Sequence, residues 1–293
     1  MQDVAAPPAE VFSRRQRLAG AAVHVYTASG SVLGLLIVLA ALEGDVEAAL
    51  WLGLAALFVD GTDGMLARRF RVKETIPWFD GALLDNIVDY LTYVFAPVVL
   101  LWTTGHLPDG AVGWVVASVP LLASCYQFCR VDAKTSDHFF LGFPSYWNVV
   151  AFYVLVLDTG ELVTSVSLLV FAVLVFVPIR YLYPSRMGAL RLVTLAFTLV
   201  WLVTYAVLVV QLPDPSPWVV AASLAYVVYY WGLSLWLTAR GAGARRAARS
   251  AAVRRTERGV ELSRPSTAWA RNTAVAWSSR GWTTCSWRAH TSM

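Results

Sequence analysis

Residues 60–89 read DGTDGMLARRFRVKETIPWFDGALLDNIVD and place four carboxylates inside stretches that are otherwise apolar enough to cross a lipid bilayer. The carboxylates belong to Asp60, Asp63, Asp85 and Asp89. A charged group near the middle of a membrane helix costs at least ~3 kcal/mol, so four of them in two neighbouring helices require a strong compensating partner. Divalent cations are the natural candidates.

The spacing of the carboxylates predicts that each pair lies on one face of a helix. Asp60 and Asp63 are three residues apart, and Asp85 and Asp89 are four apart. If the polar segment between the pairs turns in water, the helical rise puts both pairs ~12 to 14 Å from that turn, at one depth. An oxygen-rich site open to water suits Mg²⁺ or Mn²⁺, which prefer carboxylates, waters and substrate phosphates.

Small residues and one arginine are expected on the same two helix faces, at Gly64, Ala67, Arg68 and Gly81. The small side chains would let a bulky phosphorylated ligand lie against the backbone, and Arg68 offers a planar fork for phosphate oxygens. A purely structural interpretation would pair the carboxylates with nearby arginines, although a single ion pair would serve that purpose.

These residues resemble the signature of the CDP-alcohol phosphotransferase family, D-x-x-D-G-x-x-A-R, a spacer, and then G-x-x-x-D-x-x-x-D. All eight fixed positions are present. Twelve residues separate Arg68 from Gly81, a longer spacer than in most of the family. With V-K-E before a proline and L-D-N-x-x-D-Y-x-T-Y after the glycine, it resembles the branch of bacterial phosphatidylcholine synthases. So do F-x-G-F-P-x-x-W-N at 140–148 and F-x-P-I at 176–179.

The resemblance implies a specific reaction, in which a phosphatidyl group moves from CDP-diacylglycerol to choline and CMP is released. It implies two Mn²⁺ or Mg²⁺ ions held by the four aspartates, with Asp89 as the general base for the acceptor hydroxyl. It also implies that Gly64, Ala67, Arg68 and Gly81 bind the CDP-diacylglycerol through its cytidine nucleotide, and that the protein is a homodimer.

Choline carries a quaternary ammonium group, which proteins usually hold against aromatic faces. Five aromatic residues are expected near the cytoplasmic half of the membrane and are candidates for a choline pocket: Tyr93, Tyr90, Tyr126, Tyr146 and Trp147. Tyr93 is the first choice because it follows Asp89 by one helical turn. Aromatic residues at this level also serve as interfacial anchors, which is the alternative interpretation.

Four further cationic residues are candidates for binding the phosphate of the lipid donor: Lys134, Arg180, Arg186 and Arg191. Membrane topology and attraction to anionic head groups would equally explain them. His24 stands where an asparagine is frequent in the wider family. It could have a role at the site, and a packed or interfacial histidine is an equally good interpretation.

Composition indicates a membrane protein, because 58% of the 293 residues are hydrophobic and only 14% are charged. We expect an all-α integral membrane protein with eight transmembrane helices, at about 21–42, 48–68, 81–102, 112–128, 146–157, 162–181, 192–211 and 218–237. The fifth span is short, and we expect its helix to be extended from about Phe139 and broken near Pro144.

The basic residues support this count. With a cytoplasmic N-terminus, all 23 Lys and Arg fall in inner segments and none in outer loops, as the positive-inside rule requires. We therefore expect a multi-pass protein of the bacterial inner membrane, with both termini and the signature facing the cytoplasm. Residues 1–18 would be a cytoplasmic segment and 19–238 the membrane domain. Residues 239–293, with eleven arginines, would be a disordered tail that contacts membrane lipids.

The residues alone leave other functions open. A related enzyme would use serine, inositol phosphate or glycerol phosphate, although the spans contain few cations for an anionic acceptor. A cation transporter is the rival of a different class, but all four carboxylates lie toward one side. Cys125 and Cys129 have no further metal ligands nearby, which favours packing over zinc binding. No nucleic-acid partner is expected.

Overall fold

The computed structural model describes residues 12–133, 139–182 and 191–262. Their helices are α1 (Arg14–Glu43), α2 (Val46–Arg69), α3 (Val72–Thr75), α4 (Gly81–Asp89), the π-helical η1 (Tyr90–Phe95), α5 (Ala96–Thr103), α6 (Gly110–Cys129), α7 (Trp147–Val156), α8 (Glu161–Phe176), α9 (Arg191–Val210) and α10 (Pro217–Leu262). Their strands are β1 (Phe139–Leu141) and β2 (Arg180–Leu182).

Within these residues, six helices are long and apolar enough to span a membrane: Arg14–Glu43, Val46–Arg69, Gly81–Thr103, Gly110–Cys129, Leu192–Val210 and Pro217–Arg240. The shorter helices α7 and α8 are also apolar. The prediction of a helical integral membrane protein is confirmed, with the small departure that two short strands pair. Eight crossings and the sidedness of the termini stay predictions.

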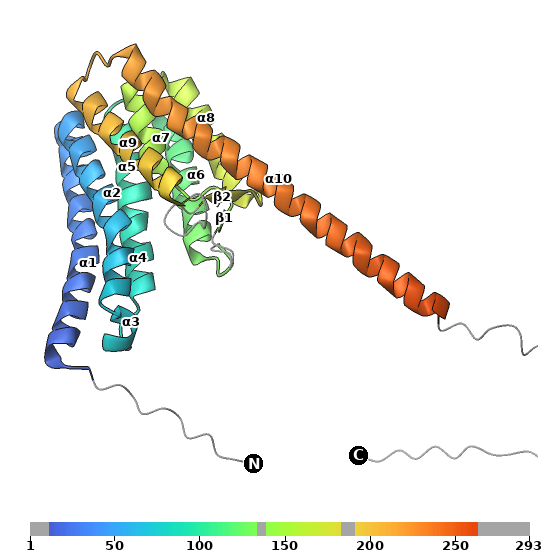
Figure 1. The fold of residues 1–293 in the computed structure, drawn as a ribbon. Coiled ribbons are helices and arrows are strands. Elements are labelled where there is room, and N and C mark those ends of the chain that lie inside the picture. The colour runs from blue at the N-terminus through green and yellow to red at the C-terminus, as the bar shows by residue number, and fades with distance from the viewer. Residues whose placement is uncertain (1–11, 134–138, 183–190, 263–293) are drawn as a thin grey trace, which may run out of the picture. The chain divides into compact units, whose positions relative to one another are not determined.

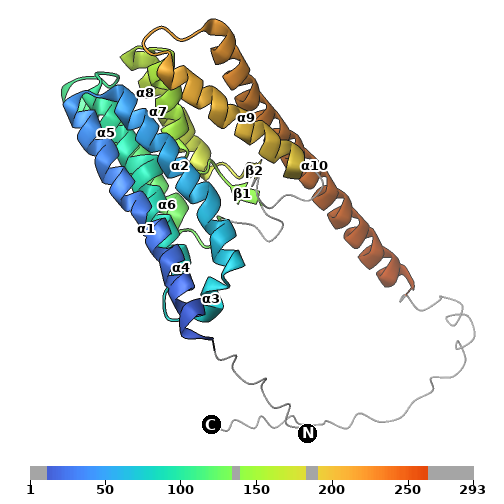
Figure 2. The ribbon, with the colours of Figure 1, turned by 60° about the vertical axis from the view of Figure 1, so that its left-hand side comes forward.

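Helices α1, α2 and α4 lie side by side, with the short α3 at one end of the group (Figures 1 and 2). Glycines on α1 make this close packing possible. A Cβ atom at Gly30 would lie 2.4 Å from Cγ1 of Val88, and one at Gly34 would lie 3.5 Å from Cβ of Leu91. Because small residues let helix backbones approach each other in a membrane, α1 fixes how α4 sits relative to α2.

The third span changes its helical geometry in the middle. In η1 the N–H of Ala96 bonds to the carbonyl of Leu91, five residues earlier. Pro97 follows directly; its ring has no N–H and clashes with the carbonyl four residues before it. The helix accommodates the proline by widening for one turn, and such turns are frequent at functional sites. Tyr93 lies in this wide turn.

The predicted helical extension of the fifth span from Phe139 is wrong. Residues 139–141 form β1, which pairs antiparallel with β2 so that Phe140 lies opposite Tyr181. Helix α7 begins only at Trp147. The physical reason is Pro144, which disfavours helical geometry at the residue before it and cannot donate a backbone hydrogen bond.

Neighbouring elements satisfy the backbone of this non-helical segment. The N–H of Gly142 donates to the carbonyl of Ile179 at 2.9 Å, and that of Phe143 donates to Leu174 at 3.0 Å. Gly142 has a φ of 82°, and a Cβ there would lie 2.1 Å from the Val175 carbonyl oxygen, so only glycine fits. The predicted sixth span to residue 181 also ends early, since α8 stops at Phe176 before Pro178.

The C-terminal end of α6 anchors β1. The carbonyl of Leu141 accepts hydrogen bonds from Nε2 of Gln127 at 3.0 Å and from Nη1 of Arg130 at 3.3 Å. Arg130 also donates two hydrogen bonds to Asp132, at 2.7 and 2.9 Å, which lower the pKa of the Asp132 carboxyl. The strand is therefore held by side chains as well as by its pairing.

The chain divides into two compact units, Met1–Arg240 and Gly241–Met293. In the first unit, one buried apolar cluster surrounds Phe143 and Trp147, and another surrounds Phe152, whose ring stacks on Tyr205 with centroids 3.8 Å apart. The backbone of α10 stays helical to Leu262, beyond residue 239 where the sequence predicts a disordered tail. Residues 263–293 lie outside the described residues.

Candidate active site

Three of the four predicted metal ligands converge. Asp60 comes from α2, and Asp85 and Asp89 come from α4; each offers a carboxylate oxygen, and these oxygens lie within 4.8 Å of one another. All three residues are partly buried. Two unit charges at 4.8 Å repel by about 3.5 kcal/mol at an effective dielectric constant of about 20. The donor set is all oxygen and remains partly open, so it fits Mg²⁺ or Mn²⁺.

A buried tyrosine orients one of these carboxylates. The hydroxyl of Tyr93 donates to Oδ2 of Asp60 at 2.5 Å, and Tyr93 is only 5% exposed. Because Tyr93 lies on η1 and Asp60 on α2, the bond joins the two helices at the level of the carboxylates. A donor to one oxygen of a metal-binding carboxylate fixes its orientation and leaves the other oxygen for an ion.

Asp63 lies in a different environment from the other three aspartates. It is 6% exposed, and its Oδ2 accepts a 2.8 Å hydrogen bond from the hydroxyl of Thr27 on α1. It is not a member of the group formed by the other three carboxylates. The hydroxyls of Tyr26 and Thr62 lie 2.7 Å apart and add a second polar contact between α1 and α2.

The four residues predicted to hold the nucleotide lie near the C-terminal end of α2 and at the N-terminal end of α4. Gly64, Ala67 and Arg68 occupy the last turns of α2, where Arg68 is exposed. Gly81 opens α4, and a Cβ at this position would lie 2.7 Å from Cε1 of His24. The absence of a side chain at Gly81 therefore makes room for the His24 ring, which extends from α1 toward α4.

His24 is packed, as one of its two interpretations predicts. Its ring lies against Phe79 with centroids 4.4 Å apart. Its Nε2 atom is buried and has no hydrogen-bond partner in the part of the chain that the structure describes.

Two of the five aromatic candidates for choline come together next to Asp60. The rings of Tyr93 and Tyr146 meet edge to face, with centroids 6.1 Å apart. Tyr230 of α10, which the sequence analysis did not single out, also lies beside Tyr146, with ring centroids 6.4 Å apart. We call Tyr93, Tyr146 and Tyr230 the tyrosine cluster.

The remaining aromatic candidates make packing contacts. Trp147 is 1% exposed, and its Nε1 donates to the hydroxyl of Ser124 at 2.7 Å. Tyr90 donates to the carbonyl of Leu121 at 3.3 Å. Tyr126 is exposed, and its ring lies 4.8 Å from that of Phe176.

Of the predicted lipid-phosphate residues, the structure describes the side chain of Arg180 alone. Its guanidinium lies 4.8 Å from the ring centroid of Phe139, and its backbone N–H donates to the hydroxyl of Thr238 at 2.8 Å. Arg191 begins α9, but its side chain lies outside the described part, as do Lys134 and Arg186.

Comparison with known proteins identifies the family. No protein-family model matches the chain. A phosphatidylcholine synthase from Pseudomonas aeruginosa is 42% identical over 219 residues, which cover 74% of this chain and 91% of that protein. The chain belongs to the phosphatidylcholine synthase family. A second member, from Legionella pneumophila, is 41% identical over 234 residues, covering 78% of this chain and 91% of that protein. Membership of the phosphatidylcholine synthases confirms the resemblance carried by the signature and its long spacer.

Proposed function

We propose that this protein transfers the phosphatidyl group of CDP-diacylglycerol to the hydroxyl of choline, giving phosphatidylcholine and CMP. The observation that carries the proposal is the convergence of Asp60, Asp85 and Asp89 on two apolar helices, in a chain of the phosphatidylcholine synthase family. Charged carboxylates are energetically unfavourable in such helices. Binding of a divalent cation together with a phosphorylated ligand would offset that cost.

Asp60, Asp85 and Asp89 would hold one divalent ion, Mn²⁺ or Mg²⁺, and Asp63 would contribute to a second. Two such ions would neutralise the diphosphate and stabilise charge on the attacking and leaving oxygens. Asp89 would accept the proton of the choline hydroxyl, for which it must come within hydrogen-bond reach of that group.

The facing ends of α2 and α4 would hold the donor nucleotide. Gly64 and Ala67 leave room against the backbone of α2, whereas the ring of His24 occupies the space beside Gly81. Arg68 is exposed beside them and can donate two parallel hydrogen bonds to phosphate oxygens. Arg180, with Lys134, Arg186 and Arg191, remains proposed for the phosphate of the lipid.

The tyrosine cluster is the proposed site for the choline ammonium. Tyr146 is its partly exposed member, and Tyr93 links it to Asp60. An ammonium held against the Tyr146 ring would therefore bring the choline hydroxyl toward the carboxylates. Trp147, Tyr90 and Tyr126 are less suited to this role because of their packing contacts.

The distribution of basic residues supports an orientation in which the site faces the cytoplasm, in the bacterial inner membrane. The proposed homodimer rests on the family resemblance.

The decisive experiment offers purified protein CDP-diacylglycerol and Mn²⁺ with choline, serine, inositol phosphate or glycerol phosphate, and follows both the lipid product and CMP. We expect phosphatidylcholine and CMP to form with choline and with none of the other three acceptors. A chelator should abolish their formation. Product with another alcohol instead would overturn the acceptor, and no CMP with any acceptor would overturn the reaction.

Variants of two aspartates sharpen this test. Asp89→Asn should abolish transfer. Asp45→Asn should not, because Asp45 caps α2 far from the site and asparagine caps equally well.

A further inference from the structure

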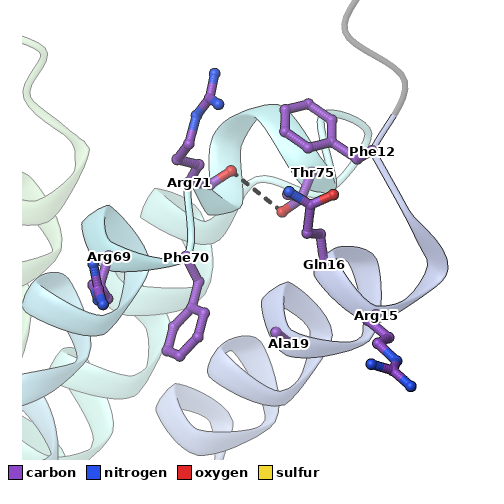
Figure 3. Close-up of a pocket in the computed structure, with 8 residues that line it drawn as sticks. All are labelled: Phe12, Arg15, Gln16, Ala19, Arg69, Phe70, Arg71 and Thr75. Atoms are coloured by element: carbon purple, nitrogen blue, oxygen red, sulfur yellow. Dashed lines mark hydrogen bonds between the residues drawn. The ribbon is translucent and has the colours of Figure 1, made fainter.

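A second candidate binding site lies at the ends of α1 and α2, apart from the three carboxylates. It is a cavity of about 260 Å³ lined by Phe12, Arg15, Gln16, Ala19, Arg69, Phe70, Arg71 and Thr75 (Figure 3). Arg69 follows Asp60 by nine residues on α2, which corresponds to ~13 Å along the helix. The cavity is therefore separate from the three carboxylates, and its lining includes none of the residues proposed for the nucleotide.

The cavity is positively charged. Arg15 of α1, Arg69 of α2 and Arg71 before α3 all contribute to its lining, and in Figure 3 their side chains point in different directions. Glu74 pairs with Arg71. In the described part of the chain, Arg15 and Arg69 form no ion pair, so three arginines face one glutamate. A cavity with this balance favours an anionic occupant.

Contacts between α1 and α3 hold the walls of the cavity. The hydroxyl of Thr75 donates to the carbonyl of Arg71 at 3.2 Å, as drawn in Figure 3. A Cβ at Gly20 would lie 2.6 Å from Oγ1 of Thr75, so α1 and α3 pack directly. The Arg71 guanidinium lies 5.2 Å from the ring centroid of Phe12. The shape is thus defined by packing, not by exposed side chains alone.

Exposed aromatic residues near the cavity favour a position at the surface of the bilayer. Phe70 is 42% exposed, and the nearby Trp78 and Phe79 are 72% and 45% exposed. Aromatic side chains gather at membrane interfaces, where lipid head groups lie. Arginine forks match the oxygens of phosphate groups.

We propose that this cavity binds a phosphate ester, supplied by the head group of an anionic phospholipid. The site is separate from the transfer reaction and does not depend on it. Inorganic phosphate has the same chemistry and is the competing source, which the experiment distinguishes.

The test uses the full chain in nanodiscs of phosphatidylcholine that contain a minor fraction of phosphatidylglycerol, with bound lipids identified by native mass spectrometry. We compare Arg15→Gln/Arg69→Gln with Arg14→Gln/Arg17→Gln. Both double variants remove two exposed positive charges at this end of the molecule, but Arg14 and Arg17 do not line the cavity. Unfolding temperatures of both verify that they fold.

The expected result is a loss of about tenfold in phosphatidylglycerol retention for the cavity variant, since each basic residue near a lipid surface contributes appreciably to anion binding. The control variant should retain nearly the full amount. Equal losses in both would mean diffuse attraction to the membrane and would overturn the site. Binding of inorganic phosphate without retention of phosphatidylglycerol would overturn the lipid as its source.

Discussion

Asp60 is the residue at which the proposed active site is most tightly connected. It lies close to Asp85 and Asp89, and its carboxylate also accepts a hydrogen bond from the hydroxyl of Tyr93. A carboxylate that binds a metal needs a fixed orientation. A hydrogen bond from a buried phenol hydroxyl can hold the carboxylate in that orientation. Tyr93 thus has a second proposed role, in positioning Asp60, besides forming part of the tyrosine cluster.

Replacing Tyr93 with phenylalanine should weaken Mn²⁺ binding by roughly tenfold, because loss of an outer-shell partner typically costs 10- to 100-fold in metal affinity or activity. Free Mn²⁺ measured by electron paramagnetic resonance reports this without relying on turnover. Tyr205→Phe is the matched control: it also removes a buried hydroxyl, but one that donates to the Leu50 carbonyl. Unchanged Mn²⁺ affinity in Tyr93→Phe would remove Tyr93 from this role.

The sequence predicts the candidate site unevenly at this scale. The grouping of Asp60 with Asp85 and Asp89 follows from helical spacing on two spans of known order. Tyr93, which bonds to Asp60, lies in the π-helical turn before Pro97. Regular α-helical spacing does not predict that turn. Tyr230 is 137 positions after Tyr93 in the sequence, and only the tertiary packing of α10 brings it into the tyrosine cluster.

At the scale of elements, α1 determines the distance between the two carboxylate-bearing helices. It bonds to Asp63 of α2 through Thr27 and receives Val88 of α4 at Gly30. Val88 immediately precedes Asp89, so a shift at this contact would move a proposed metal ligand. The packing of α1 is therefore a condition for the geometry of the site.

Gly30→Ala should lower the stability of the protein by about 1 to 3 kcal/mol, because the added methyl overlaps Val88 and forces the helices apart. Mn²⁺ binding should weaken with it. Gly232→Ala on α10 is the control, since a Cβ there meets nothing within 4 Å and alanine favours a helix. Thermal unfolding in detergent separates the two variants; equal stability would contradict the close contact.

The long spans are predictable because apolar length alone identifies them, and the sequence boundaries agree with α2 and the third span within a few residues. The segments around α7 are not. Pro144 and Pro178 end helical geometry locally, but the pairing of β1 with β2 is a contact between segments forty residues apart. The backbone of this non-helical segment is satisfied by its neighbours, since the N–H of Phe143 donates to the carbonyl of Leu174 on α8.

At the scale of the whole molecule, the second unit is expected to be dispensable for chemistry. The candidate residues all precede Gly241, where that unit begins. A chain ended after Arg240 should therefore keep nearly full transfer activity in detergent, with unaltered acceptor preference. Loss of activity in a truncated protein that still unfolds cooperatively would assign residues 241–293 a part in the reaction.

The number of crossings depends on whether α7 and α8 together traverse the bilayer. Their 10 and 16 residues correspond to ~15 and ~24 Å, each less than the ~30 Å hydrocarbon core. Yet the turn between them reaches the loop after α5, since Oδ1 of Asp158 lies 3.6 Å from Nε2 of His106. We therefore expect this turn to lie on the same face of the membrane as that loop.

Cysteine labelling tests this arrangement in cells, in a background with Cys125, Cys129 and Cys285 changed to serine. A membrane-impermeant maleimide should label Gly160→Cys in intact spheroplasts, because the distribution of basic residues predicts that the α7–α8 turn faces outward. It should label Lys73→Cys only after lysis. Lys73 lies on α3, which joins α2 to α4 at the end that the basic residues predict to face the cytoplasm. Protection of Gly160→Cys until lysis would make α7 and α8 a re-entrant pair and reduce the crossings to six. Labelling of Lys73→Cys in intact spheroplasts would instead invert the proposed orientation and place the carboxylates on the outer face.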